Sequence, residues 1–312
     1  MYFQKLYSQQ FIITTRWIAA LLALILVGGV IGACSGSQTL IDGLDREVAL
    51  QGSAQRIVSI APSNTEILFA IGAGEQVVGR DDVSDYPQEA LDVTSVGSTY
   101  GDLNTEAILA LEPDLVLAAT ITSPEQIEAL EALGIPVYLL SNPTDFTGLL
   151  ENIRTVGTLT GKEVEAEALA KSLEARIDAV AEIVSDAERV RVFYEVDGTD
   201  ATAPWTTGTD TFQDVMIDFV GGENIAADIT GWGQMNLEEI VIQNPQVVIF
   251  GEGPWVPTTS ESFSERSGWG EIAAVEDGHV FGIDTNWVDR PGPRLVDALE
   301  QMALMIHPEL YE

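Results

Sequence analysis

The stretch NTEAILALEPDLVLA, residues 104–118, recurs without a gap as NLEEIVIQNPQVVIF, residues 236–250. Each copy reads as a polar cap, about two turns of helix that a proline ends, and a short apolar run of strand length. Apolar patterning alone produces much of such a match, so chance similarity is one explanation. It does not account for the Asn-x-Glu opening that both copies share. The repeat therefore favours one αβ unit used twice.

Strand-like and helix-like segments alternate on both sides of residues 145–187. We expect strands at 56–60, 77–79, 114–118, 136–140, 190–196, 247–250 and 279–283. We expect helices at 104–111, 124–133, 211–220, 236–243 and 294–306, and one more that the capping box Ser63-Asn64-Thr65-Glu66 opens. Alternation of this kind is typical of a mainly parallel sheet covered by helices.

Between Asp145 and Ala187 the strand-like segments stop. Apolar residues recur there at spacings of three and four, at Ala166, Leu169, Leu173, Ile177, Val180 and Val184. The spacing predicts one amphipathic helix over 164–185, about 33 Å long at about 1.5 Å per residue. The prediction is therefore an α/β protein of two lobes, each with a mainly parallel sheet flanked by helices, joined by a single long α-helix. The expected bounds are 54–144 for the N-terminal lobe, 145–187 for the connecting region and 188–312 for the C-terminal lobe.

The start of the chain has a different character. Residues 17–31 form an apolar run that is short for a bilayer span and typical of a signal peptide. Cys34 follows small residues directly after this run, and it is the only cysteine, so no internal disulfide can form. We predict a signal peptide over 1–33 and a lipid anchor and tether over 34–53. The alternative is an N-terminal membrane anchor that happens to contain a cysteine.

The chain is strongly acidic, with 49 Asp and Glu against 14 Lys and Arg and a formal charge of −35. Lys5 and Arg16 are the only charged residues before Cys34, so removal of the signal peptide leaves −37. Such a surface repels phosphate, which argues against nucleic-acid binding. Only His279 and His307 could supply imidazole to a zinc or manganese site, and no Gly-x-Ser-x-Gly elbow is present. We expect no enzyme activity, no resident cofactor and no direct metal site.

Several segments together resemble one known family. They are RIVSIAPSNTEILFAIGAGEQVVGRDDVSDYP (56–87), GDLNTEAILALEPDLVLA (101–118), GGENIAA (221–227), NWVDRPGPR (286–294) and IHPEL (306–310). The chain resembles the class III substrate-binding proteins of ATP-binding-cassette (ABC) importers, and within them the cobalamin and ferric-siderophore receptors. The resemblance implies a monomeric extracytoplasmic protein, held to the membrane through a lipid on Cys34, that binds a metal chelate between two rigid lobes. Its partner would be a homodimeric ABC permease with its ATPase.

The resemblance also gives the two glutamates of the repeat a role. It implies that Glu106 and Glu238 contact arginines on the two copies of the permease. A carboxylate in the first turn of a helix is favoured by the helix dipole, which keeps it charged. The alternative is that both are ordinary N-terminal helix carboxylates.

Ligands of open α/β sheets lie beyond the carboxyl ends of the strands. The candidates in or beside such loops are Pro62, Ser63, Arg80, Tyr100, Trp205, Trp232, Trp255, Asn286, Trp287 and Arg290. Aromatic faces with a few polar groups suit a large, flat-sided ligand such as a corrinoid or an iron chelate. Alternatively, the tryptophans cap the lobe cores, and the two arginines pair with neighbouring aspartates. An alternative function is a surface-anchored haem or corrinoid carrier or enzyme on the same fold that serves no permease.

Overall fold

The computed structural model describes residues 37–101, 103–253 and 258–311. The chain divides into two units, Met1–Ser37 and Gln38–Glu312, and the fold below belongs to the second. The predicted signal peptide and Cys34 lie outside the described residues. Within the described ranges, no helix is both long enough and apolar enough to cross a bilayer.

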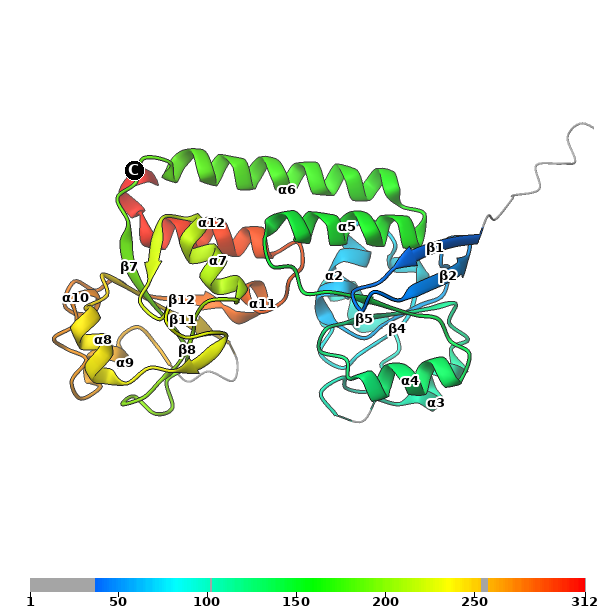
Figure 1. The fold of residues 1–312 in the computed structure, drawn as a ribbon, viewed down its shortest axis with the longest axis horizontal. Helices are drawn as coiled ribbons and strands as arrows, with labels where there is room; N and C mark the ends of the chain where they lie inside the picture. The colour runs from blue at the N-terminus through cyan, green and yellow to red at the C-terminus, as the bar shows by residue number, and fades with distance from the viewer. Residues whose placement is uncertain (1–36, 102, 254–257, 312) are drawn as a thin grey trace, which may run out of the picture. The chain divides into compact units, whose positions relative to one another are not determined.

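The N-terminal lobe is built on a four-stranded parallel sheet with the strand order β4-β3-β5-β6 (Figure 1). The strands are β3 (Ile57–Ser59), β4 (Val77–Arg80), β5 (Leu115–Ala119) and β6 (Val137–Leu140). The helices are α2 (Pro62–Ala70), α3 (Thr105–Ala110) and α4 (Pro124–Ala132), with the 3-10 turns η1 (Gly74–Gln76) and η2 (Gln88–Asp92). Every residue of β5 and β6 is buried, because helices cover both faces of the sheet.

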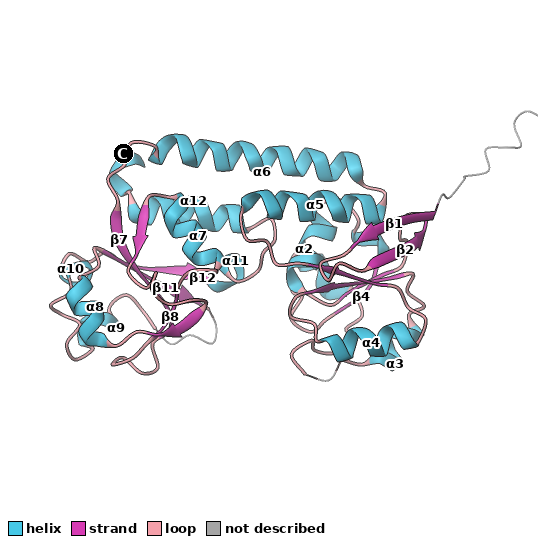
Figure 2. Cartoon of the chain, in the orientation of Figure 1, coloured by secondary structure: helices cyan, strands magenta, loops and turns pink. Residues whose placement is uncertain are grey.

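The C-terminal lobe contains a six-stranded sheet with the order β10-β8-β7-β11-β12, in which β9 also pairs with β7 (Figure 2). The strands are β7 (Val190–Asp197), β8 (Trp205–Thr207), β9 (Gly222–Asn224), β10 (Trp232–Gln234), β11 (Val247–Glu252) and β12 (Val280–Asp284). Only β8 and β10 run antiparallel to their neighbours among the described strands of this sheet. The helices are α7 (Phe212–Phe219), α8 (Leu237–Gln243), α9 (Ser262–Glu265), α10 (Ala273–Glu276), α11 (Thr285–Val288), α12 (Leu295–Ile306) and the 3-10 turn η3 (Pro308–Tyr311).

The sequence repeat corresponds to a repeat in the structure. The pairs α3–β5 and α8–β11 lie at equivalent places, since β5 runs parallel beside β3 and β11 runs parallel beside β7. In both copies the asparagine caps its helix: Asn104 accepts a hydrogen bond from Ala107 N–H at 2.9 Å, and Asn236 accepts one from Glu239 N–H at 3.0 Å. One αβ unit is therefore used twice in this fold.

Successive strand residues pack on opposite faces of each sheet. In the N-terminal lobe, one face packs with α2 and α5 (Phe146–Thr160), and the other face packs with α3 and α4. In the C-terminal lobe, one face packs with α7 and α12, and the other packs with α8, α9 and α10. The inner faces of both lobes belong to the same hydrophobic core, which α5, α6 (Glu163–Val184) and α12 join.

The connecting region consists of two helices instead of one. The predicted long helix is α6, and α5 precedes it as a second helix that the sequence analysis did not anticipate. Figure 1 shows α6 running along the same side of both lobes. The two helices approach closely at Gly157, where an added Cβ would lie 2.4 Å from the Cβ of Ala166. The α/β class with two lobes and a long connecting helix is confirmed.

The segment 34–53, expected as anchor and tether, contains a β-hairpin from Ser37 onward. Strands β1 (Ser37–Ile41) and β2 (Glu47–Gln51) pair with each other, and the side chains of Val48 and Leu50 are buried in the N-terminal core. The Tyr138 hydroxyl also donates to the Ile41 carbonyl at 2.7 Å. The folded unit therefore includes residues that the sequence analysis assigned to the tether, because they supply apolar side chains to the core.

The predicted capping box at Ser63 and Glu66 is wrong. Helix α2 begins one position earlier, with Pro62 in its first turn and Ala61 at the N-cap, and no side chain caps it. Proline is favoured at this position because its missing N–H would be unpaired there anyway. Glu66 is consequently free to point away from the helix start, and it forms an ion pair with the other lobe.

Candidate ligand-binding cleft

Two adjoining cavities lie at the carboxyl ends of the parallel strands. The larger, of about 720 Å³, extends mainly along the C-terminal lobe, and the smaller, of about 470 Å³, extends mainly along the N-terminal lobe. They share Asn142, Asp289 and Pro291, so residues of both lobes form the boundary between them. This is where the topology of open α/β sheets places a ligand.

Loops after consecutive strands line these cavities. The N-terminal lobe contributes Ala61, Pro62, Ser63, Asp82, Val83, Asp85, Tyr100, Ala119, Ile121, Asn142, Pro143 and Thr144. The C-terminal lobe contributes Val196, Thr209 to Val215, Trp232, Thr285, Asn286, Val288 to Pro291. Uncharged polar groups and aromatic rings alternate with carboxylates along this lining, an arrangement that suits a large ligand with polar edges and apolar faces.

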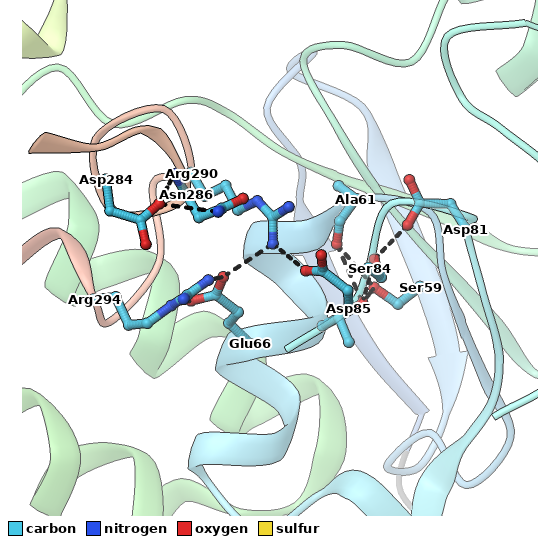
Figure 3. A network of polar contacts seen from close by, with 11 residues as sticks. Ser59, Ala61, Glu66, Asp81, Ser84, Asp85, Asp284, Asn286, Arg290 and Arg294 are labelled. Carbon is cyan, nitrogen blue, oxygen red and sulfur yellow. Dashed lines mark hydrogen bonds and ion pairs between the residues drawn. The ribbon is translucent and has the colours of Figure 1, made fainter. Parts of the chain in front are cut away.

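A cluster of ion pairs joins the two lobes beside the smaller cavity (Figure 3). Two side-chain nitrogens of Arg294, Nε and Nη2, donate hydrogen bonds to the carboxylate of Glu66, and Nε lies 3.0 Å from Glu66 Oε2. Arg290 Nη1 lies 2.6 Å from Asp85 Oδ1 and 3.8 Å from Glu66 Oε1. The Glu66 side chain is 2% exposed. We call these four residues the interlobe ion cluster.

A second polar network supports the loop after β4. Asp81 is fully buried; it accepts hydrogen bonds from the Ser84 hydroxyl and, at 3.4 Å, from the Thr99 hydroxyl. The Thr65 hydroxyl lies 2.8 Å from Ser59 Oγ and 2.9 Å from Ser84 Oγ. Burial raises the pKa of Asp81 above its ordinary value, and the hydroxyl hydrogen bonds offset only part of that rise. The network ties the loop after β4 to Ser59 of β3 and to Thr65 of α2.

Six of the ten predicted ligand residues line the two cavities. Pro62, Ser63, Tyr100, Asn286 and Arg290 surround the smaller one, and Trp232 lies in the wall of the larger one. Tyr100 and Trp232 are largely exposed, 72% and 59%, as expected for aromatic rings on an open wall. Trp255 lies outside the described residues.

Three predicted residues lie away from these cavities. The Arg80 guanidinium donates to the carbonyls of Asp81 and Ala90, at 2.8 and 2.9 Å, and so fixes a loop. Trp287 lines a different hollow, between α6 and α12. Trp205 lies in β8 opposite Gln234 of β10 and does not contribute to either cavity lining.

Several residues of the cleft were not among the candidates from the sequence, notably Asp82, Asp85, Asn142, Asp210 and Phe212. The rule that selected the other candidates, position after a strand, applies equally to Asn142, which follows β6, and to Asp82, which follows β4. Arg294, which was not among the sequence candidates, pairs with Glu66 of the other lobe.

The glutamates of the repeat lie on the far side of the lobes from α6. Glu106 and Glu238 are in the first turns of α3 and α8, and both side chains are exposed. Figure 1 shows both helices on the side of their sheets opposite α6. Among the described residues, no ion pair engages either carboxylate.

The histidines lie apart from the cleft. His279, which falls in the strand expected over 279–283, is exposed one position before β12, because the strand begins at Val280. His307 is buried, with Nδ1 3.4 Å from Glu309 Oε1. In the part of the chain that the structure describes, no group of three or more His, Cys, Asp or Glu side chains is arranged to hold a metal ion.

The fold and cleft define a two-lobed solute-binding protein, and the chain belongs to the periplasmic binding protein family, whose model matches residues 57–286. Membership in this family of binding proteins also supports the expectation that the chain is not an enzyme.

Individual relatives narrow the class. The chain is 34% identical over 280 residues to YvrC of Bacillus subtilis (strain 168), an uncharacterized ABC transporter substrate-binding lipoprotein, with 88% of this chain and 87% of the relative covered. It is 32% identical over 284 residues to a cobalamin-binding protein of Halobacterium salinarum, with 88% and 75% covered. A solved structure of the periplasmic heme-binding protein RhuT from Roseiflexus sp. RS-1 matches with a TM-score of 0.73 and 28% identity, covering 83% of this chain and 100% of that one. The chain is thus a substrate-binding component of an ABC transporter.

Proposed function

We propose that this chain is lipid-anchored on the outer face of the cell membrane and captures a metal chelate, a corrinoid or a ferric siderophore, between its lobes. The observation that carries the proposal is the pair of adjoining cavities of about 720 and 470 Å³ at the carboxyl ends of the strands. Tyr100, Phe212 and Trp232 supply aromatic faces in their walls. The cobalamin-binding and heme-binding proteins that the chain resembles support a ligand of this kind.

The interlobe ion cluster supports capture in a preformed cleft. Glu66 and Arg294 are both largely buried and belong to different lobes, so their fork-shaped pairing resists relative movement of the lobes. Ligand binding then needs little reorganisation of the protein, and less of the interaction free energy is lost to ordering it.

Titration of tryptophan fluorescence tests the proposed ligand class. The chain from Ser35 onward, which retains every described residue, is titrated with cyanocobalamin, a ferric hydroxamate, a ferric catecholate and haem, each of which absorbs strongly enough to quench a nearby indole. We expect saturable quenching, micromolar or tighter, by at least one of them. Trp232→Phe should reduce the amplitude, because Trp232 lies in the cavity wall.

Trp287 provides the matched control for that experiment. It lies between α6 and α12, away from the cleft, so Trp287→Phe should retain both the affinity and the cleft-dependent part of the quenching. If none of the four chelates gave saturable quenching, the proposed ligand class would be wrong.

The lipid anchor would be attached to Cys34, which lies outside the described residues. Its position after an apolar run and small residues is that of a lipid-modified cysteine, and the Bacillus relative is a lipoprotein. We expect the full chain to partition with membranes when produced in bacteria and Cys34→Ser to lose the lipid, as shown by mass spectrometry of the mature N-terminus. An unmodified Cys34 in the wild-type chain would contradict the anchor.

The proposed partner is a homodimeric permease with its ATPase, which the monomeric binding protein meets through Glu106 and Glu238. Two-fold symmetry of a permease requires one matching group on each lobe. The exposed carboxylates at equivalent places in α3 and α8 meet that requirement. The negative charges of Glu106 and Glu238 complement arginines, and no ion pair with a described residue neutralises them.

A further inference from the structure

The charged residues that line the cleft are almost all acidic. In the described part of the chain they are Asp82, Asp85, Asp210, Asp214, Asp289 and Arg290. The net charge that a ligand meets therefore depends on whether carboxylates already neutralise the positive charge of Arg290.

Arg290 is already compensated by the interlobe ion cluster. Its guanidinium is 15% exposed and is engaged by Asp85 at 2.6 Å and by Glu66 at 3.8 Å. Arg294 is engaged by Glu66 and lies with its guanidinium carbon 3.9 Å from the centre of the Tyr86 ring. The cluster holds two carboxylates and two guanidinium groups, so it has no excess positive charge to offer a ligand (Figure 3).

The other four lining carboxylates have only neutral hydrogen-bond partners within the described ranges. Asp82 accepts from the Ser95 hydroxyl, Asp214 from the Asn224 amide at 2.8 Å, and Asp289 from the Gln213 amide at 3.0 Å. Asp210 is exposed. Asp289 is exposed as well. These four carboxylates leave the cleft with uncompensated negative charge.

The other Lys and Arg side chains of residues 37–311 do not neutralise the negative charge of the cleft lining. Arg80, the one nearest to the cleft in sequence, directs its guanidinium at backbone carbonyls. The positions after Ser37 that the structure leaves undescribed, 102, 254–257 and 312, contain no Lys or Arg. No cation of the folded unit other than Arg290 therefore lines the two described cavities.

We propose that this cleft selects chelates without net negative charge, namely neutral or cationic corrinoids and neutral or cationic ferric hydroxamates, and rejects anionic chelates such as ferric catecholates and haem. The inference rests on the proposed function and narrows its ligand class. An anionic ligand would bring like charge close to four carboxylates, and such juxtaposition is unfavourable, most of all at low ionic strength. A neutral ligand with amide edges can instead exchange hydrogen bonds with the side-chain amides of Asn142, Gln213 and Asn286.

Probe pairs that differ in charge but not in scaffold test this selection. The first pair is ferrioxamine B, a cation, and its N-succinyl derivative, an anion. The second is cyanocobalamin, which is neutral, and its monocarboxylic acid, in which one amide becomes a carboxylate. We expect the member without negative charge to bind at least about tenfold more tightly at an ionic strength of about 0.05 M, and the ratio within each pair to shrink at about 1 M.

A cleft variant and a matched surface variant locate the effect. Asp82→Asn with Asp210→Asn removes two lining charges, one from each lobe, and Asn tolerates the left-handed backbone of Asp210, whose φ is 64°. Asp228→Asn with Asp277→Asn removes the same total charge from exposed positions outside both cavities. We expect the cleft variant to narrow the ratio within each pair several-fold and the surface variant to leave it unchanged.

The outcomes separate the two proposals. Equal or tighter binding of the anionic members would overturn the charge selection while leaving the binding function intact. An equal effect of the cleft and surface variants would overturn the assignment to these aspartates. Failure of all four probes to bind would overturn this inference, and the proposed function would fall with it only if the ferric catecholate also failed to bind in the fluorescence titration.

Discussion

At the residue scale, Glu66 is the most consequential side chain outside the cleft lining. Its carboxylate is almost completely buried and receives both arms of Arg294, with Arg290 close by. Burying such a group is favourable only while its partners remain in place, since an uncompensated buried charge is costly. The pair thus fixes how α2 of one lobe meets the start of α12 of the other.

Loss of the Glu66 charge should destabilise the protein strongly. Glu66→Gln leaves the largely buried guanidinium of Arg294 without its counter-ion, and we expect a loss of about 3–5 kcal/mol in the free energy of unfolding, measured by urea denaturation. Glu131→Gln breaks a solvent-accessible ion pair, in which the side chain of Glu131 is 46% exposed and that of Arg46 is 28% exposed. This variant should lose about 1 kcal/mol or less in the free energy of unfolding. Equal losses in the two variants would refute the structural role given to Glu66.

Sequence reasoning located the cleft better than it located individual side chains. Position after a strand selected Ser63, Asn286 and Arg290, which line the smaller cavity, because that rule follows from topology alone. It failed for Trp287, since neighbouring side chains of the four-residue helix α11 point to different faces, and Trp287 lines the hollow beside α6 and not the two cavities. It failed for Arg80 because nearby backbone carbonyls were available to that guanidinium.

At the scale of elements, Asp42 organises the turn of the hairpin β1–β2. The Asp42 carboxylate accepts hydrogen bonds from the backbone N–H groups of Leu44 and Arg46, at 2.9 and 3.0 Å, and from the Arg46 guanidinium. Burial alone would raise the pKa of Asp42, but these hydrogen bonds outweigh it and lower the pKa below its ordinary value of 3.8. The charged form is therefore the one that stabilises the hairpin.

The stability that Asp42 contributes should depend on pH in a definite direction. A carboxyl group with a lowered pKa in the folded state stabilises fully above its ordinary value of 3.8 and loses that contribution as the pH falls through the lowered value. Asp42→Asn should thus cost about 1–3 kcal/mol at pH 7, and the difference from wild type should shrink below pH 3.8. Thermal unfolding at several pH values measures this. Asp45→Asn, at an exposed position of the same turn, is the control, and a difference for Asp42→Asn that grew on acidification would contradict the argument.

Most elements were predictable and a few were not, for identifiable reasons. Buried strands such as β5 and β11 are continuous apolar runs bounded by polar or turn residues, which single-sequence patterns detect well. Helix α5 was missed because Gly148, Gly157 and several threonines weaken its helical pattern, although its buried face is regular. The hairpin was missed because SQTLI and EVALQ are short and half polar, and their partner surface is formed by distant residues such as Tyr138.

At the scale of the whole molecule, the repeat predicts a division of labour between ligand capture and delivery. Glu106→Ala with Glu238→Ala changes exposed side chains that line neither cavity, so ligand affinity in the fluorescence titration should be unchanged. Transport in reconstituted vesicles with the cognate permease should fall at least about tenfold, because a charge partner is lost on each lobe.

Glu239 supplies the control for the docking variant. It is equally exposed and adjoins Glu238 in α8, but the equivalent position of α3 is Ala107, so it has no counterpart in the other lobe. Glu239→Ala should therefore support nearly normal transport. A loss of ligand affinity in the double variant, or an equal loss of transport in Glu239→Ala, would argue against docking through the repeat.

The shared hydrophobic core restricts how proteins of this kind can diversify. Helices α5, α6 and α12 belong to one apolar cluster with strands of both lobes, and Phe146 of α5 packs edge-on against Phe212 and Phe219 of α7, with ring centres 5.3 and 5.1 Å apart. Recombination therefore cannot exchange one lobe for that of another protein without disrupting the packing of the shared core. New specificities must instead arise in the loops that follow the strands, where substitutions and insertions leave the scaffold untouched. Grafting those loops, and not swapping lobes, is the route by which such a receptor can be redesigned for another ligand.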